Sequence, residues 1–197
     1  MNEHPGVRIV AVNGTVRPSN YTSKALGLVV DEFRQHPEVD LEVVDPAKIH
    51  LPFPGEEPTE DAERLRELVS AATGVVLSTP EYHGGHSSVI KLVIENLGFP
   101  SVLSGKPVAL LGVAAGQIGA IKSLESLRSV CSHVGAIVLP GPVSVARVRD
   151  VFAPNGGILD ATIETRIRGV ATHLLDYIRR HICPAVALEA MVREGAA

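Results

Sequence analysis

Aromatic side chains are scarce in this sequence: they make up 4% of its 197 residues, and tryptophan is absent. Proteins that bind single-stranded nucleic acids stack bases on aromatic side chains, so this function is disfavoured. A strong charge of one sign is also lacking, because 18 Lys and Arg stand against 22 Asp and Glu, which gives a net charge of −4. We therefore expect no basic surface for nucleic acid among the partners.

Cysteines are few as well. Cys131 and Cys183 cannot form a disulfide framework, and neither has a neighbouring cysteine, so we expect two reduced, structural thiols. The longest apolar run, 107–115, is much shorter than the ~18 residues that a membrane span needs. The first residues lack the basic and apolar regions of a secretory signal. We expect a cytoplasmic protein with no membrane partner.

Short β-branched runs alternate with longer amphipathic stretches along the chain. The expected strands are 7–12, 41–44, 74–79, 107–113 and 136–139, and the expected helices are 22–35, 59–72, 87–97, 118–134 and 158–180. This alternation predicts an α/β fold with a parallel sheet covered by helices on both faces. We expect a single domain, 1–197, with a core at about 7–180. A C-terminal tail, 183–197, has a short helical pattern and would pack on its own domain or on a partner subunit.

Polar side chains cluster in the loop after the first expected strand. Gly14 marks its turn, Arg17 is its only charged residue, and several hydroxyl and amide groups lead into the first helix. The N-terminus of a helix offers free N–H groups, and together with hydroxyls and a guanidinium these suit a phosphate monoester. The alternative is that Ser19, Asn20 or Thr22 only caps the helix. Arg17 and the number of donors favour the phosphate site.

Two other phosphate motifs are missing. A Walker A loop requires Gly-Lys-Ser/Thr, which the sequence does not contain, and a dinucleotide fingerprint requires GxGxxG, whereas Gly14 is the only glycine of this loop. Asp45 ends the second strand, where a ribose-binding acid would lie in a dinucleotide fold. Without the glycines, we interpret Asp45 as an ordinary carboxylate at a strand end.

The loop after the third expected strand combines a tyrosine with two glycines. Gly84 would let the backbone approach a flat ligand closely, and the ring of Tyr82 could lie against that ligand. His83 and His86 have only Glu81 as a nearby carboxylate, which makes a poor set of metal ligands, so we expect no metal. These features predict a slot for a flat group.

The loop after the fourth expected strand, 114–120, consists mainly of small residues, with Gln117 and Ile118 between them. Gly116 and Gly119 would leave room for the edge of a ligand, or would only serve the turn from strand to helix. With the first two loops, this spacing indicates a phosphate site beside a flat slot, which fits a mononucleotide without identifying its base.

These loops resemble those of the NADPH-dependent FMN reductase family. That family's Gly-Ser-x-Arg loop and its Ser/Asn/Thr-rich turn are matched by 14–17 and 20–23. Its Pro-Glu-Tyr-x-x-Gly motif, followed by a helix with a lysine and an acid, is similar to 80–84 with Lys91 and Glu95. A small, glycine-rich third loop corresponds to 115–119. The resemblance covers about residues 7–180.

The resemblance implies a flavodoxin-like three-layer sandwich whose five-stranded parallel sheet has the order 2-1-3-4-5. It implies that FMN is the cofactor, with its phosphate on the first loop, its isoalloxazine along the second and its pyrimidine side at the third. The cofactor-binding residues implied are Thr15, Arg17, Asn20, Tyr21, Thr22, Ser23, Pro80, Glu81, Tyr82, His83, Gly84, Ala115, Gly116 and Gln117. The sequence departs from the family at Thr15, where serine is commoner, and at Ala120, where glycine is frequent.

The resemblance also implies an activity: hydride transfer from NADPH or NADH to FMN, which requires no catalytic residue from the protein. Electrons would pass to a quinone, azo compound, metal oxyanion or oxygen, or reduced FMN would leave for a monooxygenase. The alternatives are a flavodoxin-type electron carrier, which is usually more acidic than −4, and a module that senses a ligand or binds a partner. The resemblance also implies a homodimer or homotetramer. The helix at 87–97 and the tail offer additional apolar surface for it, unless both only cover the sheet.

Overall fold

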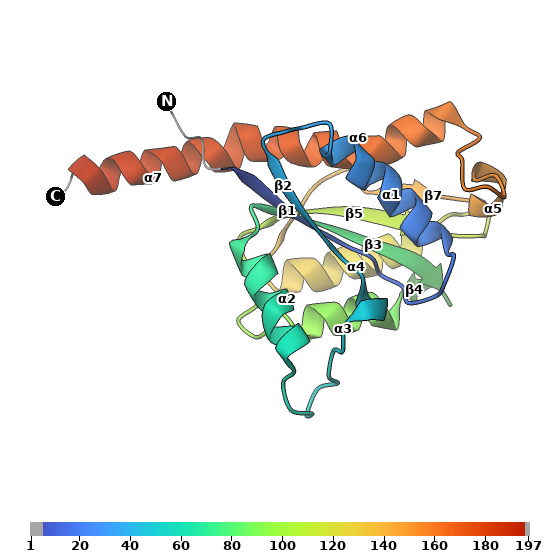
Figure 1. Cartoon of the computed structure of the whole chain (residues 1–197), viewed down its shortest axis with the longest axis horizontal. Coiled ribbons are helices and arrows are strands. Elements are labelled where there is room, and N and C mark those ends of the chain that lie inside the picture. The colour runs from blue at the N-terminus through green and yellow to red at the C-terminus, as the bar shows by residue number, and fades with distance from the viewer. Residues whose placement is uncertain (1–5, 196–197) are drawn as a thin grey trace.

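The computed structural model describes residues 6–195, which fold around a twisted, mainly parallel sheet (Figure 1). Its strands are β1 (Val7–Val12), β2 (Val39–Val44), β3 (Gly74–Tyr82), β4 (Gly85–His86), β5 (Pro107–Val113), β6 (Ile137–Val138) and β7 (Val143–Val145). The order is β2-β1-β3-β5-β6, with β4 paired to β3 and β7 to β5. Counted as the five expected strands, this is 2-1-3-4-5, so the predicted order is confirmed.

Helices cover both faces of this sheet. They are α1 (Tyr21–Phe33), the 3-10 turn η1 (Pro46–Lys48), α2 (Glu60–Ala71), α3 (Ser88–Glu95), α4 (Ile121–His133), α5 (Val148–Val151), α6 (Ala161–Tyr177), the π-helical turn η2 (Ile178–Ile182) and α7 (Cys183–Gly195). One apolar cluster joins α1 and α6 to one face, and a second joins α2, α3 and α4 to the other. The predicted three-layer sandwich is therefore confirmed (Figure 1).

Alternation along the central strands explains the two clusters. In β1, Ile9 and Ala11 belong to the cluster beneath α1 and α6, whereas Val10 and Val12 belong to the other. Successive side chains of a strand point to opposite faces, so a continuous apolar run is buried on both sides. Among residues 6–195, no helix is both long and apolar enough to cross a membrane.

Several expected boundaries differ from the structure, for example α4, which begins at Ile121 rather than 118; three of the differences have local reasons. The fifth strand is split into β6 and β7, because Pro140 and Pro142 lie between them and have no N–H to donate to the sheet. The last helix begins at Ala161 rather than 158, since the Asp160 carboxylate caps it by accepting from two backbone N–H groups. The expected loop at 80–86 is instead a hairpin formed by β3 and β4.

The last helix also continues further than expected. At η2 it passes into α7, which extends beyond the end of the sheet (Figure 1). Its large apolar side chains are 52–68% exposed: Val186, Leu188, Met191 and Val192. The apolar surface expected on helix 87–97 is mostly buried, however: Ile90, Val93, Ile94 and Leu97 are at most 4% exposed, and Val89 is partly exposed.

Candidate functional site

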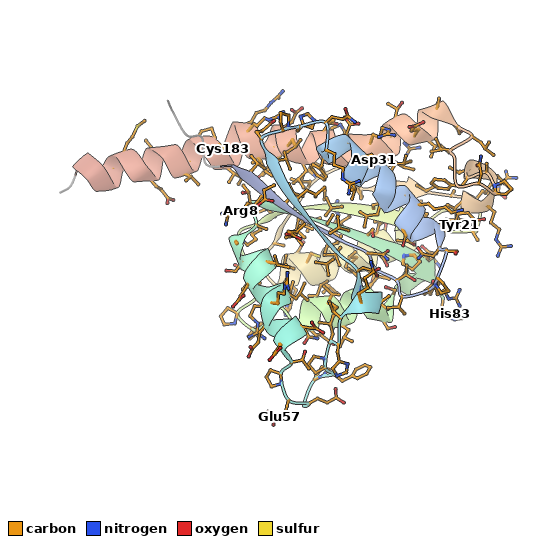
Figure 2. All side chains as sticks on the ribbon, in the orientation of Figure 1. Arg8, Tyr21, Asp31, Glu57, His83 and Cys183 are labelled. Carbon is orange, nitrogen blue, oxygen red and sulfur yellow. The ribbon has the colours of Figure 1, made fainter. Side chains whose placement is uncertain are left out.

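Segments that follow four parallel strands meet at the carboxyl edge of the sheet around a cavity of about 380 Å³, called here the edge cavity. β1 leads into the first loop, β3 carries Pro80 and Tyr82, and β5 ends beneath the cavity, while α5 follows β7. The lining residues are Arg17, Pro18, Ser19, Asn20, Tyr21, Thr22, Pro80, Glu81, Tyr82, Val113, Ala114, Ala115, Val148 and Arg149. Figure 2 shows Tyr21 and His83 at this end of the molecule. A ligand at this edge would lie at the switch point of the strand order.

Asn20 determines the shape of the first loop. Its side-chain oxygen accepts from Ser23 N at 2.7 Å and caps α1. Its amide nitrogen donates to Arg17 O at 2.6 Å and to Ser23 Oγ at 2.8 Å. Both amide hydrogens are therefore used within the loop. The capping that sequence analysis left as an alternative is real, and it falls on Asn20.

The first loop also lies unusually close to the next strand. A Cβ on Gly14 would be 2.0 Å from the carbonyl oxygen of Ser78, so only glycine fits this position. Two buried hydroxyls hold the contact: Ser78 Oγ donates to Val12 O at 2.8 Å, and Ser87 Oγ donates to Gly14 O at 2.5 Å. The β1 end is thus fixed to β3 and to the start of α3.

A two-residue turn presents the tyrosine of the second segment. His83 and Gly84 have φ values of 50° and 76°, as the tight turn of a β-hairpin requires. The guanidinium carbon of Arg17 lies 5.1 Å from the centre of the Tyr82 ring, a cation–π contact that joins the first and second segments. The Glu81 carboxylate accepts from Ser123 N at 3.2 Å and so caps α4. The N-cap residue of this helix, Ala120, has no side chain that could do so.

The third loop is bonded to α5 through two backbone hydrogen bonds. Arg147 N donates to Gly116 O at 3.1 Å, and Val148 N donates to Ala114 O at 3.1 Å. Arg147 adopts a φ of 47° to make this turn. Val148 is 3% exposed, so the short helix is anchored against the cavity and the position of Arg149 is defined.

Backbone strain concentrates around the edge cavity. Within the described part of the chain, three residues other than glycine have positive φ: Ser19, His83 and Arg147. Each lies in a different segment of the cavity wall or beside it. Such conformations cost on the order of 1–3 kcal/mol and often mark functional sites, because the surrounding structure must hold them in place.

The predicted site residues fall into three groups. The edge cavity brings together Arg17, Asn20, Tyr21, Thr22, Pro80, Glu81, Tyr82 and Ala115. Thr15 and Ser23 line a second cavity, of about 450 Å³, which shares Arg17 and Asn20 with the edge cavity. His83, Gly84, Gly116 and Gln117 line neither of these two cavities.

Sequence analysis missed two kinds of wall residue. Val113 ends the buried β5 and forms an apolar floor with Ala114 at the start of the third loop, while Val148 and Arg149 come from α5. The strand-edge rule could have found α5, because it applies to the segment after the fifth strand as much as to the other loops. Pro18 and Ser19 were within the first loop but were not singled out as ligand contacts.

Burial shifts the pKa values of titratable groups outside the edge cavity, among them His86 and Cys131. His86 Nδ1 lies 2.9 Å from Ser126 Oγ, and burial, with a contribution from Lys91, lowers the pKa of His86. Burial raises the pKa of the Cys131 thiol to about 12. In the region 6–195, no three His, Cys, Asp or Glu side chains come together in a way that could hold a metal ion.

The edge cavity fits a flat, phosphorylated ligand. The N–H groups of Tyr21 and Thr22 have no acceptor among residues 6–195, so the start of α1 can donate to an anion beside Arg17. Pro80, Val113, Ala114, Ala115 and Val148 provide apolar contact for a ring. A Cβ on Gly116 would meet nothing within 4 Å, so the third loop leaves open space there.

A sheet in this order with a phosphate-compatible cavity at its switch point defines a flavodoxin-like protein. The sequence model of the NADPH-dependent FMN reductases matches residues 7–150, and the chain belongs to this family. It is thus an oxidoreductase of a family whose cofactor is FMN and whose co-substrate is NAD(P)H.

Known proteins support this membership. The chain is 37% identical over 176 residues to an NADPH azoreductase of Bacillus sp. (strain OY1-2), covering 87% of this chain and 93% of that protein. It is 28% identical over 189 residues to an NAD(P)H-dependent FMN reductase of Pseudomonas aeruginosa, covering 88% and 96%. The fold is similar to that of FerB, a flavoenzyme NAD(P)H:(acceptor) oxidoreductase of Paracoccus denitrificans, with a TM-score of 0.73, 20% identity and coverage of 89% and 98%.

Proposed function

We propose that this chain is an NAD(P)H-dependent FMN reductase that transfers a hydride from NADPH to FMN bound in the edge cavity. The observation that carries the proposal is the union, in one cavity, of an anion cradle at the start of α1 with an apolar floor at the end of β5. When bound, FMN supplies the redox chemistry by accepting two electrons from the nicotinamide and passing them to an acceptor.

The protein's own residues bind and orient the flavin in this proposal. Arg17 and the N–H groups of Tyr21 and Thr22 hold the phosphate, with a charge-assisted hydrogen bond from the guanidinium. Asn20 keeps the loop in shape rather than donating to the ligand, since its amide hydrogens are already used. Tyr82 and the apolar floor pack along the ring and exclude water.

The acceptor that the comparisons favour is an azo compound, because the relative with 37% identity is an NADPH azoreductase. Quinones, metal oxyanions and oxygen can also accept electrons from reduced flavin. A reduced FMN that dissociates would be available to a monooxygenase. We place this activity in the cytoplasm, where both NADPH and reduced thiols prevail.

A second copy of this chain is the partner that we propose. Asn96 Nδ2 donates to Pro52 O at 3.1 Å, which holds the loop after η1 against the end of α3. Phe53 is 65% exposed and Phe99 87% exposed on these two segments. Exposed phenylalanines are costly in a monomer, so their burial against a symmetric copy would stabilise a dimer.

Anaerobic reduction tests the proposed function. Purified protein is mixed with stoichiometric FMN, NADPH or NADH is added, and the flavin's visible band is followed against a control without protein. We expect rapid bleaching that depends on the protein. Tight binding of FMN without bleaching would instead indicate an electron carrier. No binding would indicate that the first loop only caps α1 and holds no phosphate. Sedimentation equilibrium on the same sample measures the oligomeric state.

A further inference from the structure

Two arginines line the edge cavity, and they come from different segments. Arg17 belongs to the first loop, whereas Arg149 belongs to α5, 132 positions further along the chain. The only acid in the wall is Glu81, whose carboxylate already accepts from Ser123 N at the start of α4. The cavity therefore presents two cationic side chains to whatever it binds.

In the proposed function, FMN requires only one of these cations. It carries a single phosphate, and the first loop already offers that group Arg17 and the free N–H groups of Tyr21 and Thr22. Arg149 stands on the α5 side of the wall, next to Val148, which forms part of the apolar contact surface. A second anionic group would account for the second arginine.

The local structure holds Arg149 ready for such a group. The bonds from Arg147 N and Val148 N to the third loop fix the backbone, and Val148 is buried. Arg147 Nε pairs with Asp150 Oδ2 at 3.2 Å, so the neighbouring acid is engaged by the other arginine of the helix. The Arg149 side chain is exposed and has no hydrogen bond or ion pair with any of residues 6–195.

The co-substrate supplies the missing anion. NADPH differs from NADH only by the 2′-phosphate of its adenosine, a dianion at neutral pH remote from the reacting nicotinamide. When the nicotinamide lies against the flavin, the rest of the dinucleotide must leave the cavity over its rim. An unpaired arginine on that rim is the side chain best suited to a phosphate, because its planar fork can donate two parallel hydrogen bonds.

We propose that Arg149 binds the 2′-phosphate of NADPH and thereby gives this chain its preference for NADPH over NADH. The proposal rests on the proposed function, since it takes the edge cavity as the place where flavin and nicotinamide meet. It makes Arg149 a specificity-determining residue that touches the co-substrate and does not contact the phosphate of FMN.

Isothermal titration calorimetry with adenosine 2′,5′-bisphosphate and 5′-AMP tests this assignment without turnover. The two probes differ only in the 2′-phosphate. We expect FMN-loaded protein to bind the bisphosphate at least tenfold more tightly than 5′-AMP, and R149M to lose about tenfold of that preference while its affinity for 5′-AMP stays unchanged. R149K should keep part of the preference, because it keeps the charge but loses the fork.

Arg166 provides a matched control. It is an exposed arginine on α6 outside the edge cavity, so R166M removes the same charge from the protein without touching the proposed site. We expect R166M to bind both probes like the wild type. A preference that R149M and R166M reduce equally would indicate a general effect of net charge and would overturn the proposal.

The dissociation constant of FMN, measured on the same variants by absorbance, distinguishes failure of the Arg149 assignment from failure of the proposed function. A wild type that binds FMN but does not distinguish the probes would overturn the role of Arg149 and leave the reductase proposal standing. An R149M variant that binds FMN more weakly would assign Arg149 to the flavin phosphate and also overturn it. A wild type that fails to bind FMN would contradict the proposed function itself, and the probes can still be titrated against the free protein.

Discussion

The two ends of the sheet are built on different principles. Figure 2 places Tyr21 and His83 at the carboxyl edge, and Arg8 and Cys183 at the opposite end. At the carboxyl edge, side chains cap the helices, and Ser19, His83 and Arg147 adopt positive φ in addition to Gly84 and Gly119. At the amino edge, glycines take such positions in the turns before β5 and β6, where Gly105 N donates to Gly135 O at 2.9 Å.

This difference suggests that the amino edge serves folding stability and that the carboxyl edge serves ligand binding. Turns at the amino edge use the residue that adopts positive φ most easily, and Lys106 Nζ satisfies two carbonyls at the end of α2 at 2.7 and 2.8 Å. The carboxyl edge keeps strained residues, unused N–H groups and a cavity. We infer that changes at the amino edge alter unfolding, that changes in the cavity wall alter ligand binding, and that only the junctions of the carboxyl edge alter both.

The largest expected effect is at such a junction. Gly14→Ala would place a Cβ 2.0 Å from the backbone oxygen of Ser78, which neither strand can avoid without moving. We expect the free energy of unfolding in urea to fall by about 3 kcal/mol and FMN binding to weaken with it. Gly116→Ala is the matched control: it meets nothing within 4 Å, so its stability should change by less than about 0.5 kcal/mol. Equal losses in both variants would contradict the close approach of β1 and β3.

An intermediate effect is expected in the wall of the cavity. In the proposed site, Arg17 donates a charge-assisted hydrogen bond to the phosphate of FMN, so we expect Arg17→Ala to weaken FMN binding by about 1.5–3 kcal/mol. Riboflavin, which has no phosphate, should bind almost as well as to the wild type. Titration of both flavins, followed by fluorescence quenching, measures the difference. Weakening of the two ligands by the same factor would remove Arg17 from the phosphate site.

The smallest effect is expected away from the cavity, at Cys131 in the last turns of α4. Burial raises the pKa of this thiol to about 12, whereas in the unfolded chain it titrates near about 8.5. Above that pH the unfolded state releases a proton that the folded state keeps, so stability is full at lower pH and falls as the pH rises. We expect a loss of about 1 kcal/mol between about pH 8.5 and 9.5.

Cys131→Ala isolates this contribution, because all other titrating groups are shared with the wild type. Over the same pH interval, the free energy of unfolding of this variant should fall by about 1 kcal/mol less than that of the wild type. The dissociation constant of FMN at neutral pH should stay within twofold. A variant with the same pH dependence as the wild type would show that the thiol does not titrate differently on unfolding.

Residue patterns within short segments predicted a strand, a helix start and the loops that line the edge cavity. The strand 7–12 was placed correctly, because six largely apolar residues buried on both faces leave a continuous signal. The helix expected at 59–72 begins where Thr59 caps α2, because its hydroxyl accepts from Ala62 N at 3.2 Å. The loops that line the edge cavity were chosen for their residue types and for their positions after strands, and both features are visible in the sequence.

What sequence analysis missed depends on distant partners. α5 has four residues, too few to show a helical period, and it is held by bonds to Gly116 and Ala114. Glu81 caps a helix 42 positions away, which no local motif reveals. The hairpin of β4 turns on His83, whose positive φ is unusual for its residue type.

The straight course of α6 and α7 has a practical consequence. α6 ends at the amino edge, and the 13 residues of α7 then extend for about 20 Å beyond the sheet, directed away from the edge cavity (Figure 1). A linker attached after Gly195 would therefore let the enzyme be immobilised on an electrode or a resin with its edge cavity facing the solution. The same helix would serve as a built-in spacer in a fusion with a dehydrogenase that regenerates NADPH.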